Sequence, residues 1–214
     1  MAIGTKICGL KTAEAVEAAV AGGAAYVGFV FFPPSPRYLE VEQAKVLAEA
    51  IPENVKKVAL LVEESPDRIA EILKIVPIDI LQFHGQESPA YVAEMRERFS
   101  LPTMKAIAVS DAEDLEQAQS QYESVIDYFL FDAKPPKGAT RPGGNAVTFD
   151  WSLLANFQTS VPWFLAGGLT KENVGEAVSA SGARLVDLSS AVEESPGVKN
   201  PSLIRDFLFH TSKL

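Results

Sequence analysis

The sequence predicts an α/β fold, a single-domain (β/α)8 or TIM barrel that spans residues 1–214. Short apolar, β-branched runs alternate eight times with segments rich in Ala, Glu and Leu, whose apolar positions recur at helical spacing. This alternation is typical of parallel strands joined by crossover helices, and no change in composition marks a linker. With 47% hydrophobic and 22% charged side chains, the chain can bury a large core, although 214 residues is short for this fold.

The predicted strands are the apolar runs. Tyr26–Phe32 is nearly continuous, as expected of a parallel strand covered on both faces. In the first strand, alternation places Lys6 and Cys8 on one side and Ile7 on the other, and Gly9 then lets the chain turn away. In chain order, strands are expected at residues 4–8, 26–32, 57–62, 78–83, 103–109, 126–132, 161–166 and 184–188.

Capping residues mark where the predicted helices begin. Two caps, Ser65 and Ser88, precede a proline that suits the first helical position, and Ser110 with Glu113 forms a predicted capping box. The other predicted caps are Thr12, Asp150, Thr170 and Asn200. Helices are expected at residues 13–21, 40–50, 66–76, 89–99, 111–122, 151–157, 171–179 and 201–210, with a short extra helical turn within 189–199.

An open, doubly wound sheet is the alternative fold. It predicts a glycine-rich dinucleotide fingerprint near the first turn, and this sequence has none there. Between Ala133 and Thr148 the chain is too rich in Pro, Gly and Lys for regular structure, and a loop of that length in a compact domain is usually functional or disordered.

Composition excludes several classes of partner and cofactor. A net charge of -9 argues against nucleic acid or an anionic membrane as the main partner. One cysteine permits no internal disulfide, and no apolar run has the length of a signal peptide or membrane span, so we expect a soluble, cytoplasmic protein. With two histidines and one cysteine, no transition-metal cluster can be assembled from the usual ligands, and we expect no cofactor.

Polar residues occur where the predicted strands end. In a (β/α)8 barrel these ends and the loops after them form the working face. The candidate site residues are Cys8, Ser35, Arg37, Gln82, His84, Asp132, Gly167, Gly168, Asp187, Ser189 and Ser190.

Cys8 and Asp132 are the candidates for proton transfer. A lone cysteine is more often a small buried hydrophobic residue, but an adjacent Lys6 ammonium would lower the pKa of this thiol. Asp132 closes an apolar strand, where a carboxyl group that faces a cavity stays protonated or pairs with a cation. The alternative for Asp132 is a structural salt bridge with Lys134 or Lys105.

Arg37 and two glycine- or serine-containing turns are the candidates for anion binding. The planar guanidinium of Arg37 suits a carboxylate or phosphate, and the alternative is a solvated surface arginine. The turns AGGLT and DLSSAVE follow the seventh and eighth strands, whose loops in barrels commonly hold a phosphate on backbone amides. Either turn alone could be an ordinary tight turn.

Seven motifs in order along nearly the whole chain resemble the phosphoribosylanthranilate isomerase family of tryptophan biosynthesis. They are KICGL from Lys6, YVGFVFFPPSPRY from Tyr26, LQFHG from Leu81, FLFDAKPP from Phe129, GGN from Gly143, LAGGL from Leu165 and VDLSSAVEESPGVK from Val186. The resemblance implies a (β/α)8 barrel that performs an Amadori rearrangement of N-(5-phosphoribosyl)anthranilate without metal or coenzyme. Its product is 1-(2-carboxyphenylamino)-1-deoxyribulose 5-phosphate.

The resemblance also implies roles for residues. Cys8 would be the general base, Asp132 the general acid and Arg37 the partner of the anthranilate carboxylate. Further substrate contacts are expected from Gln82, His84, Gly143 and Gly144, and phosphate contacts from Gly167, Gly168, Asp187, Ser189 and Ser190. The expected partner is a small phosphosugar, and the chain is expected to be a monomer or a homodimer.

Three departures from the family pattern stand out. The chain has Gly143-Gly144-Asn145-Ala146 where the family commonly has GGTG, Ala191 where it has Gly, and Asn200 where it has Asp. Ala191 adds a methyl near the expected phosphate amides, whereas Asn200 caps a helix as well as Asp does.

Two other functions remain as alternatives. A histidine-pathway phosphoribosyl isomerase would need one carboxylate at the position of Cys8 and another near the end of the fifth strand. This sequence has Val109 and Ser110 at the second position. A non-catalytic sensor of phosphorylated metabolites would have no use for both Cys8 and Asp132.

Overall fold

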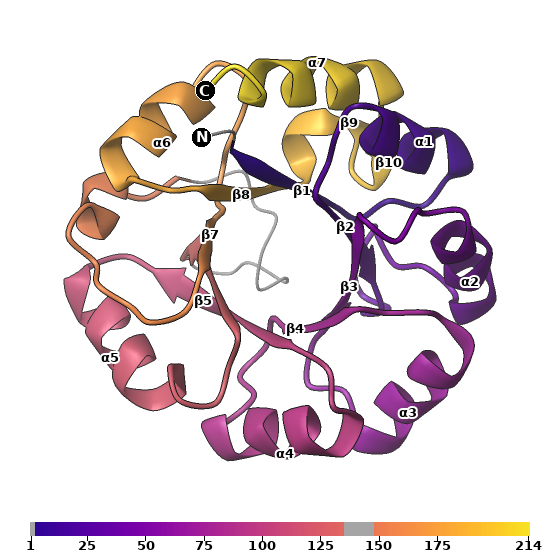
Figure 1. Cartoon of the computed structure of the whole chain (residues 1–214), viewed down its shortest axis with the longest axis horizontal. Helices are drawn as coiled ribbons and strands as arrows, with labels where there is room; N and C mark the ends of the chain where they lie inside the picture. Colours follow the sequence, from indigo (N-terminus) through magenta and orange to yellow (C-terminus); the bar gives the residue numbers. More distant parts are fainter. Residues whose placement is uncertain (1–2, 135–147) are drawn as a thin grey trace.

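Eight parallel strands form a closed barrel in a computed structural model, which describes residues 3–134 and 148–214. Each strand pairs with the next along the chain, and β8 returns to β1 with Lys6 opposite Asp187, which closes the ring (Figure 1). This closure confirms the predicted barrel and excludes the open sheet. The strands are β1 (Gly4–Cys8), β2 (Tyr26–Val30), β3 (Lys56–Leu61), β4 (Ile80–Phe83), β5 (Thr103–Val109), β6 (Tyr128–Ala133), β7 (Trp163–Leu165) and β8 (Leu185–Leu188).

Seven α-helices of the described residues surround the barrel (Figure 1). Thr12, Ser65 and Ser88 cap their helices as predicted, since each side chain accepts a hydrogen bond from the backbone N–H three residues later. The helices are α1 (Ala13–Ala21), α2 (Val41–Glu49), α3 (Pro66–Ile75), α4 (Pro89–Phe99), α5 (Ala112–Tyr122), α6 (Val174–Ser181) and α7 (Pro201–Thr211). None of the described helices is both long and apolar enough to cross a membrane.

The predicted start of α5 was wrong by one residue. The reciprocal capping box is formed by Asp111 and Asp114, not by Ser110 and Glu113. The Asp114 carboxylate accepts hydrogen bonds from both the backbone N–H and the hydroxyl of Ser110, at 2.7 and 2.8 Å. A carboxylate offers more acceptor positions than a hydroxyl, so the aspartates take the capping role.

Two later helices also differ from the prediction. Asp150 caps only a 3-10 turn, η1 (Trp151–Leu154), where a helix to residue 157 was expected. Helix α6 begins at Val174, because the Asn173 side chain accepts from the Thr170 N–H and donates to the Gly168 carbonyl. These two bonds hold residues 170–173 in a turn ahead of the helix.

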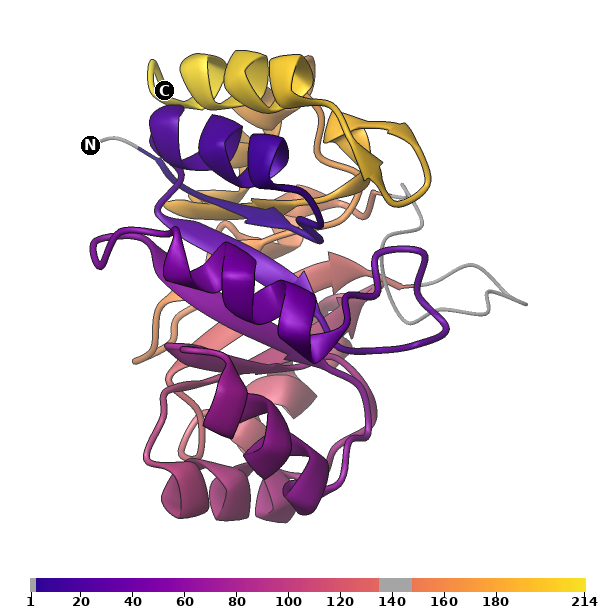
Figure 2. The same ribbon diagram turned by 90° about the vertical axis from the view of Figure 1, so that its right-hand side faces the viewer.

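The segment after β8 contains more structure than the predicted helical turn. A short 3-10 turn, η2 (Ser190–Val192), leads into an antiparallel hairpin of β9 (Glu193–Ser195) and β10 (Val198–Lys199). Figure 2 shows this hairpin on the side toward which the barrel strands point, near the loop that follows β2. Asn200 then caps α7 by accepting from the backbone N–H groups of Ser202 and Leu203, as predicted.

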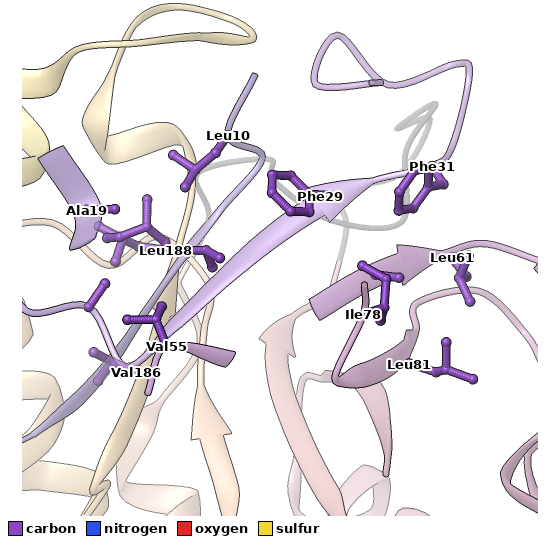
Figure 3. Close-up of a cluster of buried hydrophobic side chains, with 14 of the residues drawn as sticks. Leu10, Ala19, Phe29, Phe31, Val55, Leu61, Ile78, Leu81, Val186 and Leu188 are labelled. Atoms are coloured by element: carbon purple, nitrogen blue, oxygen red, sulfur yellow. The ribbon is translucent and has the colours of Figure 1, made fainter. Parts of the chain in front are cut away.

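Alternation along the strands produces two apolar layers. The outer layer lies between barrel and helices and includes Phe29, Leu61, Leu81 and Val186 (Figure 3). The inner layer fills the barrel with Val58, Ile80, Met104, Ala106, Leu130, Phe164 and Ala166. Some apolar runs extend past the hydrogen-bonded strand into buried loop, as at Phe31, so β2 and several other strands are shorter than predicted.

Candidate active site

Strand alternation places Cys8, Gln82 and Asp132 on the inner face of the barrel. Residues two apart on a strand share a face, so Gln82 follows the inward Ile80 on β4 and Asp132 follows the inward Leu130 on β6. Cys8 and Lys6 alternate with the outward Ile7 on β1. Because the eight barrel strands are parallel, the residues at their carboxyl ends gather at one mouth of the barrel.

Cys8 lies in a compact, buried setting. Its thiol packs over Gly28 of β2, where an added Cβ would lie 2.8 Å from Sγ. The same Cβ would lie 3.2 Å from Nζ of Lys6, so ammonium and thiol are neighbours. Lys6 Nζ donates to Oδ1 of Asp187 at 2.7 Å, which ties β1 to β8.

Burial decides the acidity of these groups. Loss of solvation raises the pKa of the Cys8 thiol, and the nearby Lys6 ammonium offsets this only in part. The prediction that Lys6 lowers the thiol pKa below its ordinary value was therefore wrong for the free protein. Burial opposes the charge on Lys6 as well, yet Asp187 and Cys8 together raise the Lys6 pKa.

Asp132 makes its polar contacts with neighbours in the mouth. Its Oδ1 accepts from the Ala133 N–H at 2.8 Å, and its Oδ2 lies 3.6 Å from Nε2 of His84. The other ring nitrogen of His84 lies 2.9 Å from Nε2 of Gln82, whose buried Oε1 has no hydrogen-bond partner among the described residues. Gln82, His84 and Asp132 thus form one line of polar groups.

The alternative partners predicted for Asp132 are engaged elsewhere. Lys134 lies 3.7 Å from Asp114, and Lys105 is paired with Glu87 at 3.0 Å. The salt-bridge alternative for Asp132 is therefore wrong with respect to both lysines.

Gly167 allows the turn after β7 to pass close to Asp132. Its φ is +85°, and an added Cβ would lie 2.6 Å from the backbone nitrogen of Ala133 and 3.0 Å from Oδ1 of Asp132. Gly168 also has a positive φ. This turn and the Ser189-Ser190 turn follow neighbouring strands, as a shared ligand between them requires.

Arg37 is buried rather than solvated, so the surface alternative is wrong. Its Nε and Nη2 donate to the two carboxylate oxygens of Glu193 at 2.7 and 2.9 Å. The same Glu193 accepts from Lys199 Nζ at 2.6 Å, and Lys199 also donates to the carbonyl and hydroxyl of Ser189. Sequence reasoning missed Glu193 and Lys199, although both lie in the motif VDLSSAVEESPGVK.

The remaining candidates can be placed as follows. The Ser189 hydroxyl donates to the Cys8 carbonyl at 2.9 Å, and Ala191 packs its methyl against the outer core. Ser35 accepts from the Arg37 N–H at 3.1 Å. Gly143 and Gly144 lie outside the described residues. Within the described ranges no group of three or more His, Cys, Asp or Glu side chains could hold a metal ion.

Comparisons with known proteins match this chain to one family of isomerases. A family model described as N-(5'phosphoribosyl)anthranilate (PRA) isomerase matches residues 5–209. The isomerase of Cereibacter sphaeroides is 55% identical over 203 residues, which cover 95% of each chain.

Solved structures of the same isomerase are also similar. The Thermotoga maritima enzyme has a TM-score of 0.87 and 34% identity, and the match covers 99% of this chain and 100% of that one. A phosphoribosyl anthranilate isomerase in complex with reduced 1-(o-carboxyphenylamino)-1-deoxyribulose 5-phosphate has a TM-score of 0.84 and 32% identity over 99% of this chain and 100% of that one.

Proposed function

Because the chain belongs to the N-(5'-phosphoribosyl)anthranilate isomerase family and is an isomerase of tryptophan biosynthesis, we propose that Cys8 and Asp132 are its catalytic base and acid. The observation that carries this proposal is the inward position of both groups at the carboxyl ends of β1 and β6. Strand alternation brings this thiol and this carboxyl group to one barrel mouth.

The proposed reaction is an Amadori rearrangement that begins with a proton transfer from Asp132 and continues with a proton transfer to Cys8. Asp132 gives a proton to the ribose ring oxygen while the anthranilate nitrogen forms a double bond to C1, which breaks the C1–O bond and opens the ring. Cys8 as thiolate then takes the proton from C2, and the electrons of that C–H bond form the C1=C2 bond of an enolamine. Transfer of the C2 hydroxyl proton to solvent and protonation of C1 yield the ketone.

Two ammonium groups near Cys8 favour the thiolate that the proposed base requires. Burial raises the pKa of the Cys8 thiol, while the ammonium groups of Lys6 and Lys199 favour the thiolate. Two neighbouring cations reduce the cost of forming the thiolate in a buried site.

We assign substrate binding to the groups around this pair. Arg37 binds the anthranilate carboxylate, Gln82 and His84 contact the substrate beside Asp132, and Gly143 with Gly144 completes the site. The backbone amides at Gly167, Gly168, Ser189 and Ser190 bind the phosphate. Asp187 is ion-paired with Lys6, and since a carboxylate repels a phosphate, we assign it to the thiol side of the site.

Turnover of phosphoribosylanthranilate by purified variants tests the assignment. Cys8→Ser and Asp132→Asn are each expected to lower kcat by roughly 10²- to 10⁴-fold, the usual contribution of a general acid or base. Circular dichroism should show that both variants remain folded. The histidine-pathway analogue is assayed in parallel, and near-full activity of folded Asp132→Asn would remove the acid assignment.

A further inference from the structure

Arg37 is held from two sides. On one side Glu193 binds the guanidinium through two parallel hydrogen bonds, and both side chains are less than one-tenth exposed. On the other side the aliphatic part of Arg37 packs across Gly9, where an added Cβ would lie 2.8 Å from Cδ. Gly9 follows Cys8 directly, so this packing places Arg37 against the backbone next to the residue that carries the thiol.

The charged groups around Arg37 carry a net positive charge, which favours the binding of one more anion. Glu193 is the carboxylate shared by two buried cations, Arg37 and Lys199. One negative charge between two positive ones leaves a net positive charge in a region largely removed from water, where an added anion is strongly attracted. Arg37 uses Nε and Nη2 for Glu193, and no described residue accepts a hydrogen bond from Nη1.

The hairpin that carries Glu193 is fitted to the loop that carries Arg37. Gly197, at the turn between β9 and β10, has a φ of +85°, and an added Cβ would lie 2.2 Å from the Pro36 carbonyl oxygen. Figure 2 shows the hairpin and the β2 loop on the same side of the barrel. The position of Glu193 relative to Arg37 is therefore set by backbone contact as well as by the ion pair.

We infer that Glu193 is a positioning residue, which orients Arg37 so that Nη1 binds the carboxylate on the substrate's aromatic ring. This inference rests on the proposed role of Arg37 and adds the residue that sets its direction. It assigns the β9–β10 hairpin to substrate recognition. A purely structural Glu193 would instead support the binding of every ligand equally.

Binding of two stable ligands separates these roles. The first is reduced 1-(o-carboxyphenylamino)-1-deoxyribulose 5-phosphate, and the second is its phenylamino counterpart without the ring carboxylate. Calorimetry compares wild type with Glu193→Gln and with Glu194→Gln, a matched control on the same hairpin whose exposed side chain contacts Asn200. Arg37→Ala is measured with both ligands.

Glu193→Gln makes the site more positive, but the loss of the two parallel hydrogen bonds that orient Arg37 is expected to outweigh this. The affinity for the carboxylated ligand should fall roughly ten- to a hundredfold, the range for hydrogen bonds to a charged group. The affinity for the ligand without the carboxylate should change by less than about threefold, the size of the effect of one weak contact. In turnover, the loss should lie mainly in KM. Glu194→Gln should match wild type with both ligands.

Equal weakening of both ligands by Glu193→Gln, or no weakening of either, would overturn the inference. If Glu193→Gln does not fold, Gly197→Ala pushes the hairpin away from Pro36 without a change of charge and should show the same selective loss. Arg37→Ala tests the underlying assignment separately. If Arg37→Ala weakens the binding of both ligands equally, or of neither, the role of Arg37 in the proposed function is wrong, whatever the outcome at Glu193.

Discussion

Lys6 and Asp187 form a buried ion pair, with 2.7 Å between Nζ and Oδ1, on adjacent strands beside the Cys8 thiol. The two side chains are 0% and 11% exposed. Asp187 both keeps Lys6 charged and adds a negative charge that disfavours the thiolate. The two members of the pair therefore act in opposite directions on the pKa of Cys8: Lys6 lowers it and Asp187 raises it.

Asp187→Asn is expected to lower the pH at which the Cys8 thiolate forms. The substitution removes a charge that raises the thiol pKa, and it leaves the thiolate as the nearby anion for Lys6. The ultraviolet absorbance of the thiolate, followed against pH, measures the midpoint, with Cys8→Ser as the blank. Asp206→Asn, at an exposed pair on α7, is the control and should not shift it. A midpoint that stays or rises in Asp187→Asn contradicts the prediction.

Gly28→Ala is expected to reduce kcat by more than about tenfold, because a general base must stay within hydrogen-bond reach of its proton. The added Cβ would lie 2.8 Å from Sγ and 3.2 Å from the Cys8 Cα, so the thiol has to move. Gly175→Ala is the control. Its added Cβ would meet only Leu214, at an ordinary contact distance of 3.6 Å, in the first turn of α6. Unchanged kcat in Gly28→Ala would show that the thiol position is not critical.

Glu87→Gln is expected to destabilise the fold by about 3–5 kcal/mol, the usual cost of breaking a buried ion pair. Glu87 accepts from Lys105 and from the backbone N–H groups of Glu63 and Gly85, and its side chain is 2% exposed. Burial already lowers the pKa of Lys105, and the loss of its partner leaves that charge uncompensated. Urea unfolding measures the change.

The control for Glu87 is Glu71→Gln. Glu71 pairs with Arg68 at 3.0 Å on the exposed face of α3, where such pairs contribute less than about 1 kcal/mol. Equal destabilisation by both substitutions would mean that burial does not set the strength of the Lys105 pair.

Acid is expected to remove the stability contributed by Glu193. Although burial acts in the opposite direction, hydrogen bonds from Arg37 and the charge of Lys199 lower the pKa of this carboxyl group below its ordinary 4.5. A carboxyl group with a lowered folded pKa stabilises the fold above its unfolded pKa, and this contribution is lost as the pH falls through the folded value.

Wild type should therefore be more stable than Glu193→Gln at about pH 6, and the difference should shrink toward about pH 3. Thermal unfolding across this range measures it, with Glu194→Gln as the control. A difference that grows on acidification would mean that Glu193 is not held as a carboxylate.

Local patterns predicted most of the elements correctly. Thr12, Ser65, Ser88 and Asn200 cap helices because a side-chain oxygen reaches backbone N–H groups two or three residues away, which depends on nearby sequence alone. The error at the start of α5 arose because Ser110 and Asp111 are adjacent residues that can both cap a helix.

By itself, then, the sequence determined the order of strands and helices and the inward alternation that brings Cys8 and Asp132 to the barrel mouth. Only the tertiary structure decided which side chains from distant parts of the chain surround them. Lys6 and Asp187 are 181 residues apart in the chain, and Arg37 and Glu193 are 156 apart. Such pairs form only when the barrel closes, and the burial that closure brings also raises the thiol pKa against the influence of Lys6.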